Sequence, residues 1–147
     1  MKFKHEKDLN RVLFLHPVAL IILFDMFVYC SKKNLPFVVT STVSTIEEDQ
    51  KIGRRSATHR EGRAFDLSVK GWSTDEIDDF MFYFQRKYRE FAAKNKKGEQ
   101  VLIPPINHGT APHFHVQISR AITSKTVDLN QKVDFLTNEA FLTMVKK

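Results

Sequence analysis

Apolar positions with a helical spacing define the clearest element of the chain. Between Ser73 and Asn95 the apolar side chains recur at intervals of three and four residues: Ile77, Phe80, Met81, Phe84, Tyr88 and Phe91. This spacing places them on one face of a helix, so the pattern predicts a long helix whose aromatic side chains pack in the core. Ser73 and Glu76 have the spacing of a capping box, which predicts where the helix begins.

A second apolar stretch, residues 12–30, predicts a buried helix over 17–32. Pro17 suits the first position of a helix, because its missing N–H is not needed there. His16, Pro17 and Asp25 interrupt the stretch, and a charged residue at a bilayer centre costs about 3 kcal/mol. We therefore expect no stable membrane insertion. The sequence CSKKN that follows is a poor signal-peptidase site, so we expect the protein to be cytoplasmic at synthesis.

Short segments with alternating or β-branched residues are predicted to be strands: 36–41, 64–69, 101–105 and 113–119. The polar stretch between the first two predicts a loop or short helix over 42–57. The charged first ten residues are expected to adapt to the surface, and the tail from 123 to form a short amphipathic helix. This order predicts an α+β fold in a single domain, 1–147, with a small antiparallel sheet flanked by helices.

The composition is that of an ordinary globular chain: 147 residues, 42% apolar and 27% charged. A net charge of +6 indicates either solubility or an acidic partner such as nucleic acid or an anionic cell envelope. No nucleic-acid-binding motif accompanies the charge, so we expect no nucleic acid partner, and we expect a monomer. The single cysteine, Cys30, excludes an internal disulfide and a thiolate zinc site.

The sequence HFH at 113–115 places two histidines on one face of a predicted strand. Residues i and i+2 of a strand share a face, so His113 and His115 point together while Phe114 and Val116 point into the core. Two adjacent imidazoles are costly to bury unless they have a use, and neutral imidazole is a common ligand of metal ions. An isolated HxH is nevertheless more often an ordinary surface or core histidine pair.

A carboxylate on a second strand makes the metal interpretation more specific. In the strand 64–69, Asp66 shares a face with Ala64 and Ser68, whereas Phe65 and Leu67 face the core. His59 would come from the preceding loop, folded back by a turn at Gly62, where glycine permits conformations closed to other residues. Two histidines, one carboxylate and one open position describe a catalytic zinc site.

The segments HREGRAFDL (59–67) and HFHV (113–116) together resemble the zinc peptidases of the D-alanyl-D-alanine carboxypeptidase group. That group includes phage endolysins that cut L-alanyl-D-glutamate bonds, and the zinc-bearing hedgehog signalling domain shares its fold. The resemblance covers about residues 36–119. It implies a Zn²⁺ cofactor, peptidoglycan stem peptides as substrates, and three metal ligands: His59, Asp66 and His115.

The chain departs from the pattern of this group in two places. Pro112 stands where many members carry an acidic general base, and no Asp or Glu lies between Glu99 and Asp128. The segment that carries a substrate-binding arginine in many members, S-G-Y-R, corresponds here to S-T-V-S at 41–44. The sequence therefore leaves open which residue is the base and which group holds the substrate.

Three groups are candidates for the general base of this site. His113 ranks first, because it lies two positions before the last ligand and should face the same pocket. His108, on the turn NHGTA, ranks second, with a satisfied loop histidine as the alternative. The acidic residues 47–49 of the preceding loop rank third.

Other polar residues near the first motif have open roles. Arg63 could bind a substrate carboxylate or pair with a surface acid. Ser56 and Thr58 are expected to bond groups that orient His59.

The leading hypothesis from the sequence is a hydrolase: a zinc metallopeptidase that degrades the bacterial cell wall, such as a phage endolysin released to the wall after synthesis. Whether it would be a carboxypeptidase or an endopeptidase, and which peptide linkage it would cut, does not follow from the sequence. The alternative is a zinc-binding module of the same fold without hydrolytic activity.

Overall fold

The computed structural model describes residues 1–95, 98–105 and 111–124 and has the expected α+β fold. Its main sheet has the strand order β1-β2-β3-β7-β6. The strands are β1 (Lys2–Phe3), β2 (Val38–Ser41), β3 (Ala64–Ser68), β7 (His113–Gln117) and β6 (Leu102–Ile103). All neighbours are antiparallel except β1 and β2, which are parallel. A separate hairpin joins β4 (Ala93–Asn95) and β5 (Gly98–Gln100).

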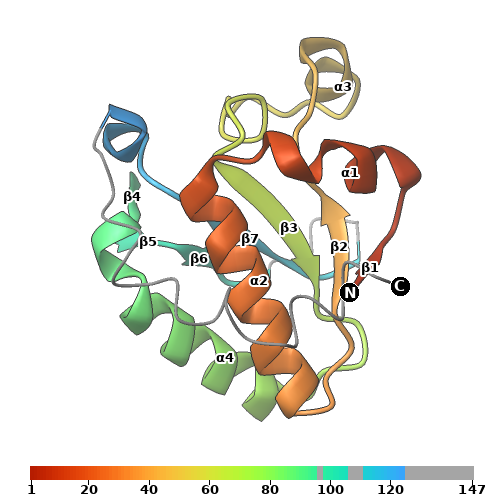
Figure 1. Ribbon diagram of the computed structural model, residues 1–147, viewed down its shortest axis with the longest axis vertical. Helices are drawn as coiled ribbons and strands as arrows, with labels where there is room; N and C mark the ends of the chain where they lie inside the picture. Colours follow the sequence, from red (N-terminus) through yellow and green to blue (C-terminus); the bar gives the residue numbers. More distant parts are fainter. Residues whose placement is uncertain (96–97, 106–110, 125–147) are drawn as a thin grey trace.

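Two helices cover one face of the main sheet (Figure 1). The helical segments are α1 (Glu6–Arg11), η1 (Val12–Phe14), α2 (Pro17–Lys32), α3 (Ile46–Lys51), α4 (Thr74–Lys87), η2 (Arg89–Phe91) and η3 (Arg120–Ser124). Helices α2 and α4 lie against the sheet and bury apolar residues with it, whereas α1 and α3 lie at one end of the molecule. No helix in the described ranges is long and apolar enough to cross a membrane.

Strands β3 and β7 have the predicted alternation. Phe65 and Leu67 of β3, and Phe114 and Val116 of β7, are completely buried in the core with the two helices. Because neighbouring residues of a strand point to opposite faces, the residues between them project from the face that α2 and α4 leave uncovered. The apolar alternation thus fixes the direction in which the polar residues point.

The first ten residues were expected to adapt to the surface, but they form regular structure with one buried acid. They form β1, which extends the sheet, and α1, whose Asp8 is only 3% exposed. The charged composition of this segment gave no sign that one of its acids is buried, because the partner lies far along the chain.

Helix α4 begins as predicted but is shorter than its apolar periodicity indicated. Ser73 and Glu76 form both hydrogen bonds of the capping box, whereas the helix ends at Lys87 rather than near Asn95. Tyr88 and Phe91 keep the apolar face buried through the 3-10 turn η2, so the burial pattern continues after the α-helix has stopped. The predicted strand 101–105 is also shorter, with only Leu102–Ile103 paired as β6.

The remaining predicted elements occur where expected. Pro17 is the first residue of α2, and the His16 ring accepts a hydrogen bond from the Val18 N–H at its start. The stretch 42–57 contains the short helix α3. The amphipathic helix expected from 123 onward falls almost entirely outside the described residues.

Candidate metal centre

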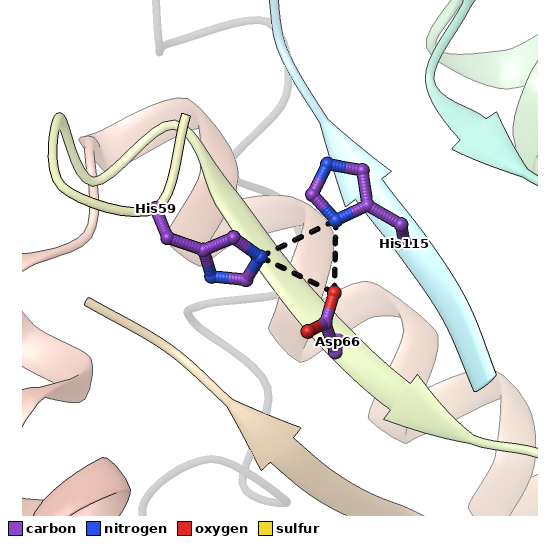
Figure 2. Close-up of side chains that lie close together, drawn as sticks. All are labelled: His59, Asp66 and His115. Atoms are coloured by element: carbon purple, nitrogen blue, oxygen red, sulfur yellow. Dashed lines mark hydrogen bonds and ion pairs between the residues drawn. The ribbon is translucent and has the colours of Figure 1, made fainter. Parts of the chain in front are cut away.

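Three potential metal ligands converge on the uncovered face of the sheet (Figure 2). Asp66 comes from β3, His115 from its direct partner position on β7, and His59 from the loop before β3. Asp66 Oδ1 lies 2.9 Å from His115 Nδ1 and 3.3 Å from His59 Nε2. The two ring nitrogens are 3.3 Å apart. The structure therefore brings together the three residues that the sequence singled out as ligands.

The spacing of these atoms suits a tetrahedral cation. Ligands at about 2.05 Å from a tetrahedral zinc ion are separated from one another by about 3.3 Å. Two of the three observed separations equal this value, and the third, between Asp66 Oδ1 and His115 Nδ1, is shorter at 2.9 Å, a hydrogen-bond distance. The donor set of two imidazoles and a carboxylate is one that zinc accepts. Three lone pairs facing one another repel unless a proton or a cation lies among them, so the arrangement can hold a metal ion.

A tight turn brings His59 back toward β3. Gly62 donates its N–H to the His59 carbonyl at 3.0 Å, and Arg63 donates to the Thr58 carbonyl at 2.8 Å. Gly62 has a positive φ of 64°, and a Cβ at this position would lie 2.5 Å from the Phe14 backbone oxygen. The predicted turn at Gly62 is therefore present, and it requires glycine both for its conformation and for its close packing.

The ring of His59 is completely buried and is oriented by backbone. Its Nδ1 lies 2.6 Å from the Thr42 carbonyl oxygen, which can only accept, so Nδ1 carries the proton. Nε2 is then left with a lone pair directed at Asp66 and His115. The expected orienting role of Ser56 and Thr58 is not what the contacts show, since these two hydroxyls bond each other at 3.1 Å.

Asp66 is held in its charged form. Burial alone would raise its pKa, but charge and hydrogen bonds from His59 and His115 in their protonated forms lower the pKa well below the usual value for an aspartate. Arg54 Nη2 also lies 3.3 Å from Asp66 Oδ2, the carboxylate oxygen that faces away from the two imidazoles. Asp66 can therefore offer Oδ1 to a metal ion while Arg54 engages Oδ2.

The acidic residues of α3 have contacts of their own. Asp49 is buried between Arg54 and Arg60, at 3.2 and 2.7 Å, and Glu48 pairs with Lys7 and Arg11. None of the three acidic residues is among those that line the pocket beside the metal ligands. Their expected role as a third source of a base gains no support from this geometry.

A pocket of about 270 Å³ opens beside the three ligands. It is lined by Arg54, Ser56, Thr58, Asp66, Ile103, Pro104, His113 and His115. His113 is thus on the pocket wall as predicted, and its Nδ1 lies 3.1 Å from the Ala111 carbonyl oxygen. Nδ1 therefore donates, which leaves Nε2 as a proton acceptor. His108, the second candidate base, is outside the described residues.

Arg63 is engaged away from this pocket. Its Nε donates to Glu61 at 2.7 Å and its Nη1 to the Ile118 carbonyl at 2.7 Å, and the residue is only 8% exposed. Of the two roles considered from the sequence, pairing with an acid is therefore present in the structure. Binding of a substrate carboxylate by Arg63 stays a prediction.

Arg54 is the pocket residue that sequence reasoning missed. It stands in a polar loop with Arg55, and nothing in that local pattern separates one arginine from the other. The signal lies in the fold, because α3 delivers Asp49 to one side of Arg54 and β3 delivers Asp66 to the other.

No protein-family model, curated protein or solved structure matches this chain. The interpretation of the metal centre therefore rests on its own geometry and donor chemistry.

Proposed function

We propose that this protein is a zinc-dependent peptidase that hydrolyses amide bonds in peptidoglycan stem peptides, in the manner of a phage endolysin. The observation that carries the proposal is the convergence of His59, Asp66 and His115 beside an open pocket, whose wall includes Asp66 and His115 while His59 is completely buried. The motifs that hold these residues also carry the resemblance to the carboxypeptidase group. A metal site in a pocket wall, rather than in a closed core, is what a catalytic site requires.

A zinc ion held by these three residues would supply a Lewis acid and lower the pKa of a bound water to about 7. His59, Asp66 and His115 would hold the ion, and Thr42 orients His59 through its carbonyl group. Two imidazoles and one carboxylate also suit iron(II), so the identity of the metal is part of the proposal.

His113 is the proposed proton acceptor. Its ring lines the pocket next to His115, and the Ala111 carbonyl fixes the proton on Nδ1, which leaves Nε2 available. His113 would take the role of the acid that is absent at Pro112. A general base contributes about 10²–10⁴-fold to the rate of a hydrolysis. The protonated imidazole can then return the proton to the leaving amine.

Arg54 is the proposed contact for a substrate carboxylate. Its guanidinium lines the pocket while it pairs with Asp49 and Asp66, and it is 19% exposed. An arginine has five N–H donors, so it can bind a further carboxylate without releasing its partners. Stem peptides carry free carboxylates, and this cation favours such an acidic peptide over a neutral one.

The second candidate function is a zinc-binding module without hydrolysis. It is favoured by one observation: among the described residues of the pocket wall, Asp66 is the only carboxylate, and it is a proposed metal ligand. If His113 does not act as a base, the described part of the pocket wall has no further acidic group to replace it.

Metal content tests the site directly. The protein is purified without added metal and analysed for zinc and iron, together with His59→Ala and the control His5→Ala, which removes an exposed histidine far from the site in sequence. We expect about one zinc per chain in the wild type and in the control, and loss in His59→Ala. A wild type that is empty and refuses added zinc would contradict both candidate functions.

Hydrolysis separates the two candidates. Purified peptidoglycan is digested with wild type and with His113→Ala, and the released fragments are identified by mass. We expect the wild type to cut one type of amide bond, and His113→Ala to keep its zinc while losing about 10²–10⁴-fold in rate. Zinc binding with no turnover on any peptidoglycan would support the binding module instead.

A further inference from the structure

A buried acid on α1 contacts the residue that orients His59. Asp8 Oδ1 accepts the Thr42 backbone N–H at 2.8 Å. Thr42 Oγ1 lies 3.1 Å from both Oδ1 and the backbone oxygen of Asp8 and can donate to either. Asp8 is 3% exposed and Thr42 is completely buried, so solvent does not compete with these contacts.

Thr42 needs such a contact because the sheet no longer holds it. The pairing of β2 with β3 ends at Ser41 and is already irregular between Val39 and Ser41. Thr42 is the next residue, and its N–H and carbonyl point to Asp8 and to His59 rather than to a neighbouring strand. The carboxylate of Asp8 therefore takes the place of a strand partner.

The position of the Thr42 carbonyl decides what His59 can do. A carbonyl accepting from Nδ1 fixes both the tautomer and the direction of the ring, and so presents the Nε2 lone pair to the metal position. If Thr42 shifted, the 2.6 Å contact with Nδ1 would be lost, and either nitrogen could carry the proton.

The free-energy cost of burying Asp8 also suggests that this residue has a specific role in holding Thr42. Its Oδ2 has no hydrogen-bond partner among the described residues although it is buried, and an unpaired buried polar atom costs about 1–3 kcal/mol. The described hydrogen bonds of the Asp8 side chain go to Thr42 alone. The charged N–H···O⁻ bond is stronger than a neutral one, which suits a group that must hold a single backbone position.

We infer that Asp8 is a positioning residue of the metal centre, acting on His59 through Thr42. This inference deepens the proposed function and rests on it for the metal. It assigns a role in the site to the segment α1, which lies outside residues 36–119 that carry the resemblance.

The test measures zinc affinity by competition with a chelator in Asp8→Ala, Asp8→Asn and Val39→Ala. Val39 is completely buried on β2 as part of the hydrophobic core, so it controls for general destabilisation. We expect Asp8→Ala to weaken zinc binding about tenfold or more, as loss of an outer-shell partner does. Asp8→Asn keeps an acceptor for the Thr42 N–H and should stay within about threefold of wild type.

The second readout needs no metal. In metal-free protein labelled with ¹⁵N, His59 of the wild type should show a protonated Nδ1 and an unprotonated Nε2, whereas Asp8→Ala should show a mixture of tautomers. A wild-type protein that binds no zinc would contradict the proposed function. The tautomer measurement would still decide the role of Asp8.

Wild-type affinity and a wild-type tautomer in Asp8→Ala would overturn the inference. So would an equal loss of affinity in Val39→Ala at an equal loss of melting temperature. If Asp8→Ala does not fold, Asp8→Leu decides instead, because it fills the space of the Asp8 side chain and removes the acceptor of the Thr42 N–H. Unchanged zinc affinity and tautomer in that variant would then contradict the inference.

Discussion

Gly62 is the residue on which the geometry of the first ligand depends most directly. Its positive φ and the 2.5 Å approach to the Phe14 oxygen leave no room for a side chain. Gly53 has a similar φ of 69° but nothing within 4 Å of the position of a Cβ. Substitution of Gly53 would therefore introduce backbone strain alone, whereas substitution of Gly62 would add a steric clash.

Gly62→Ala should lower the free energy of unfolding by about 3 kcal/mol and also weaken zinc binding, because relief of the clash moves the turn that carries His59. Gly53→Ala should cost about 1 kcal/mol, from strain alone, and leave zinc binding unchanged. Chemical denaturation and zinc titration of both variants check this. Equal effects of the two substitutions would show that the contact with Phe14 is unimportant.

Arg54 should matter for the substrate and much less for the metal. Because it contacts Asp66 through Oδ2 and leaves Oδ1 free, Arg54→Gln should keep about one zinc per chain. Loss of a charged hydrogen bond to the substrate should raise KM about tenfold. Steady-state kinetics on stem peptides with and without a free carboxylate would show this, and an equal effect on both peptides would contradict it.

The three candidate metal ligands could be identified from the sequence, whereas the residues that contact them from elsewhere in the fold could not. Asp66 and His115 follow from the alternation of β3 and β7, since apolar neighbours fix the direction of each side chain. Thr42 acts through its backbone carbonyl, which carries no sequence signal. Asp8 contacts a residue 34 positions away, and only the folded chain brings them together.

At the scale of elements, a single carboxylate joins α1 to α3. Glu48 accepts from Lys7 at 2.8 Å and Arg11 at 2.6 Å, while it also closes the capping box with Thr45. The contact with Lys7, with the Thr45 N–H next, lowers the pKa of Glu48 to about 2. The position of α1, and with it Asp8, depends in part on this charge.

A carboxyl group with a folded-state pKa below its unfolded value of about 4.3 adds stability above that value. The contribution is lost as the pH falls from about 4.3 toward about 2. Glu48→Gln keeps the capping interaction but not the charge, so it should lower stability by about 1 kcal/mol at pH 7 and by nearly nothing at pH 2. Urea denaturation at both pH values measures this.

Asp78→Asn is the control for that comparison, because it removes one negative charge at an exposed position of α4. It should change stability much less at pH 7. A Glu48→Gln effect that persists undiminished at pH 2 would show that the side chain stabilises the fold by packing rather than by charge.

The end of α4 shows what apolar periodicity cannot resolve. Tyr88 and Phe91 keep the spacing of the helix face and are buried, yet the α-helix has ended before them. Gln85 accepts hydrogen bonds from the N–H groups of Val101 and Leu102, which ties the last turn to the strand region beyond the hairpin. Such contacts between distant segments decide where a helix ends, and the local sequence does not contain them.

At the scale of the whole molecule, the two faces of the main sheet have different roles: one packs in the apolar core, and the other carries the residues that could bind a metal ion. Helices α2 and α4 cover one face, whereas Asp66 and His115 project from the other, where the loop before β3 places His59 beside them. A metal ion would therefore cross-link β3, β7 and the loop before β3 without disturbing the core. Binding to the folded state alone must raise its stability.

Zinc at about 1,000 times its Kd should raise the free energy of unfolding by about 4 kcal/mol, and a chelator should reverse the gain. Thermal denaturation with and without each addition checks this. His115→Ala is the best control, because this ring is the most exposed of the three ligands at 22% and its loss least affects the core. An equal rise in His115→Ala would mean that zinc acts elsewhere.

The order in which a ribosome makes the chain has a consequence for the metal centre. His115 follows His59 by 56 residues, and it faces the other ligands only when β7 pairs with β3. A nascent chain that lacks β7 can present no more than two of the three ligands. Binding of a metal ion by all three residues would therefore follow translation of nearly all the described residues, so scarcity of the metal would act on a chain that is already almost fully made.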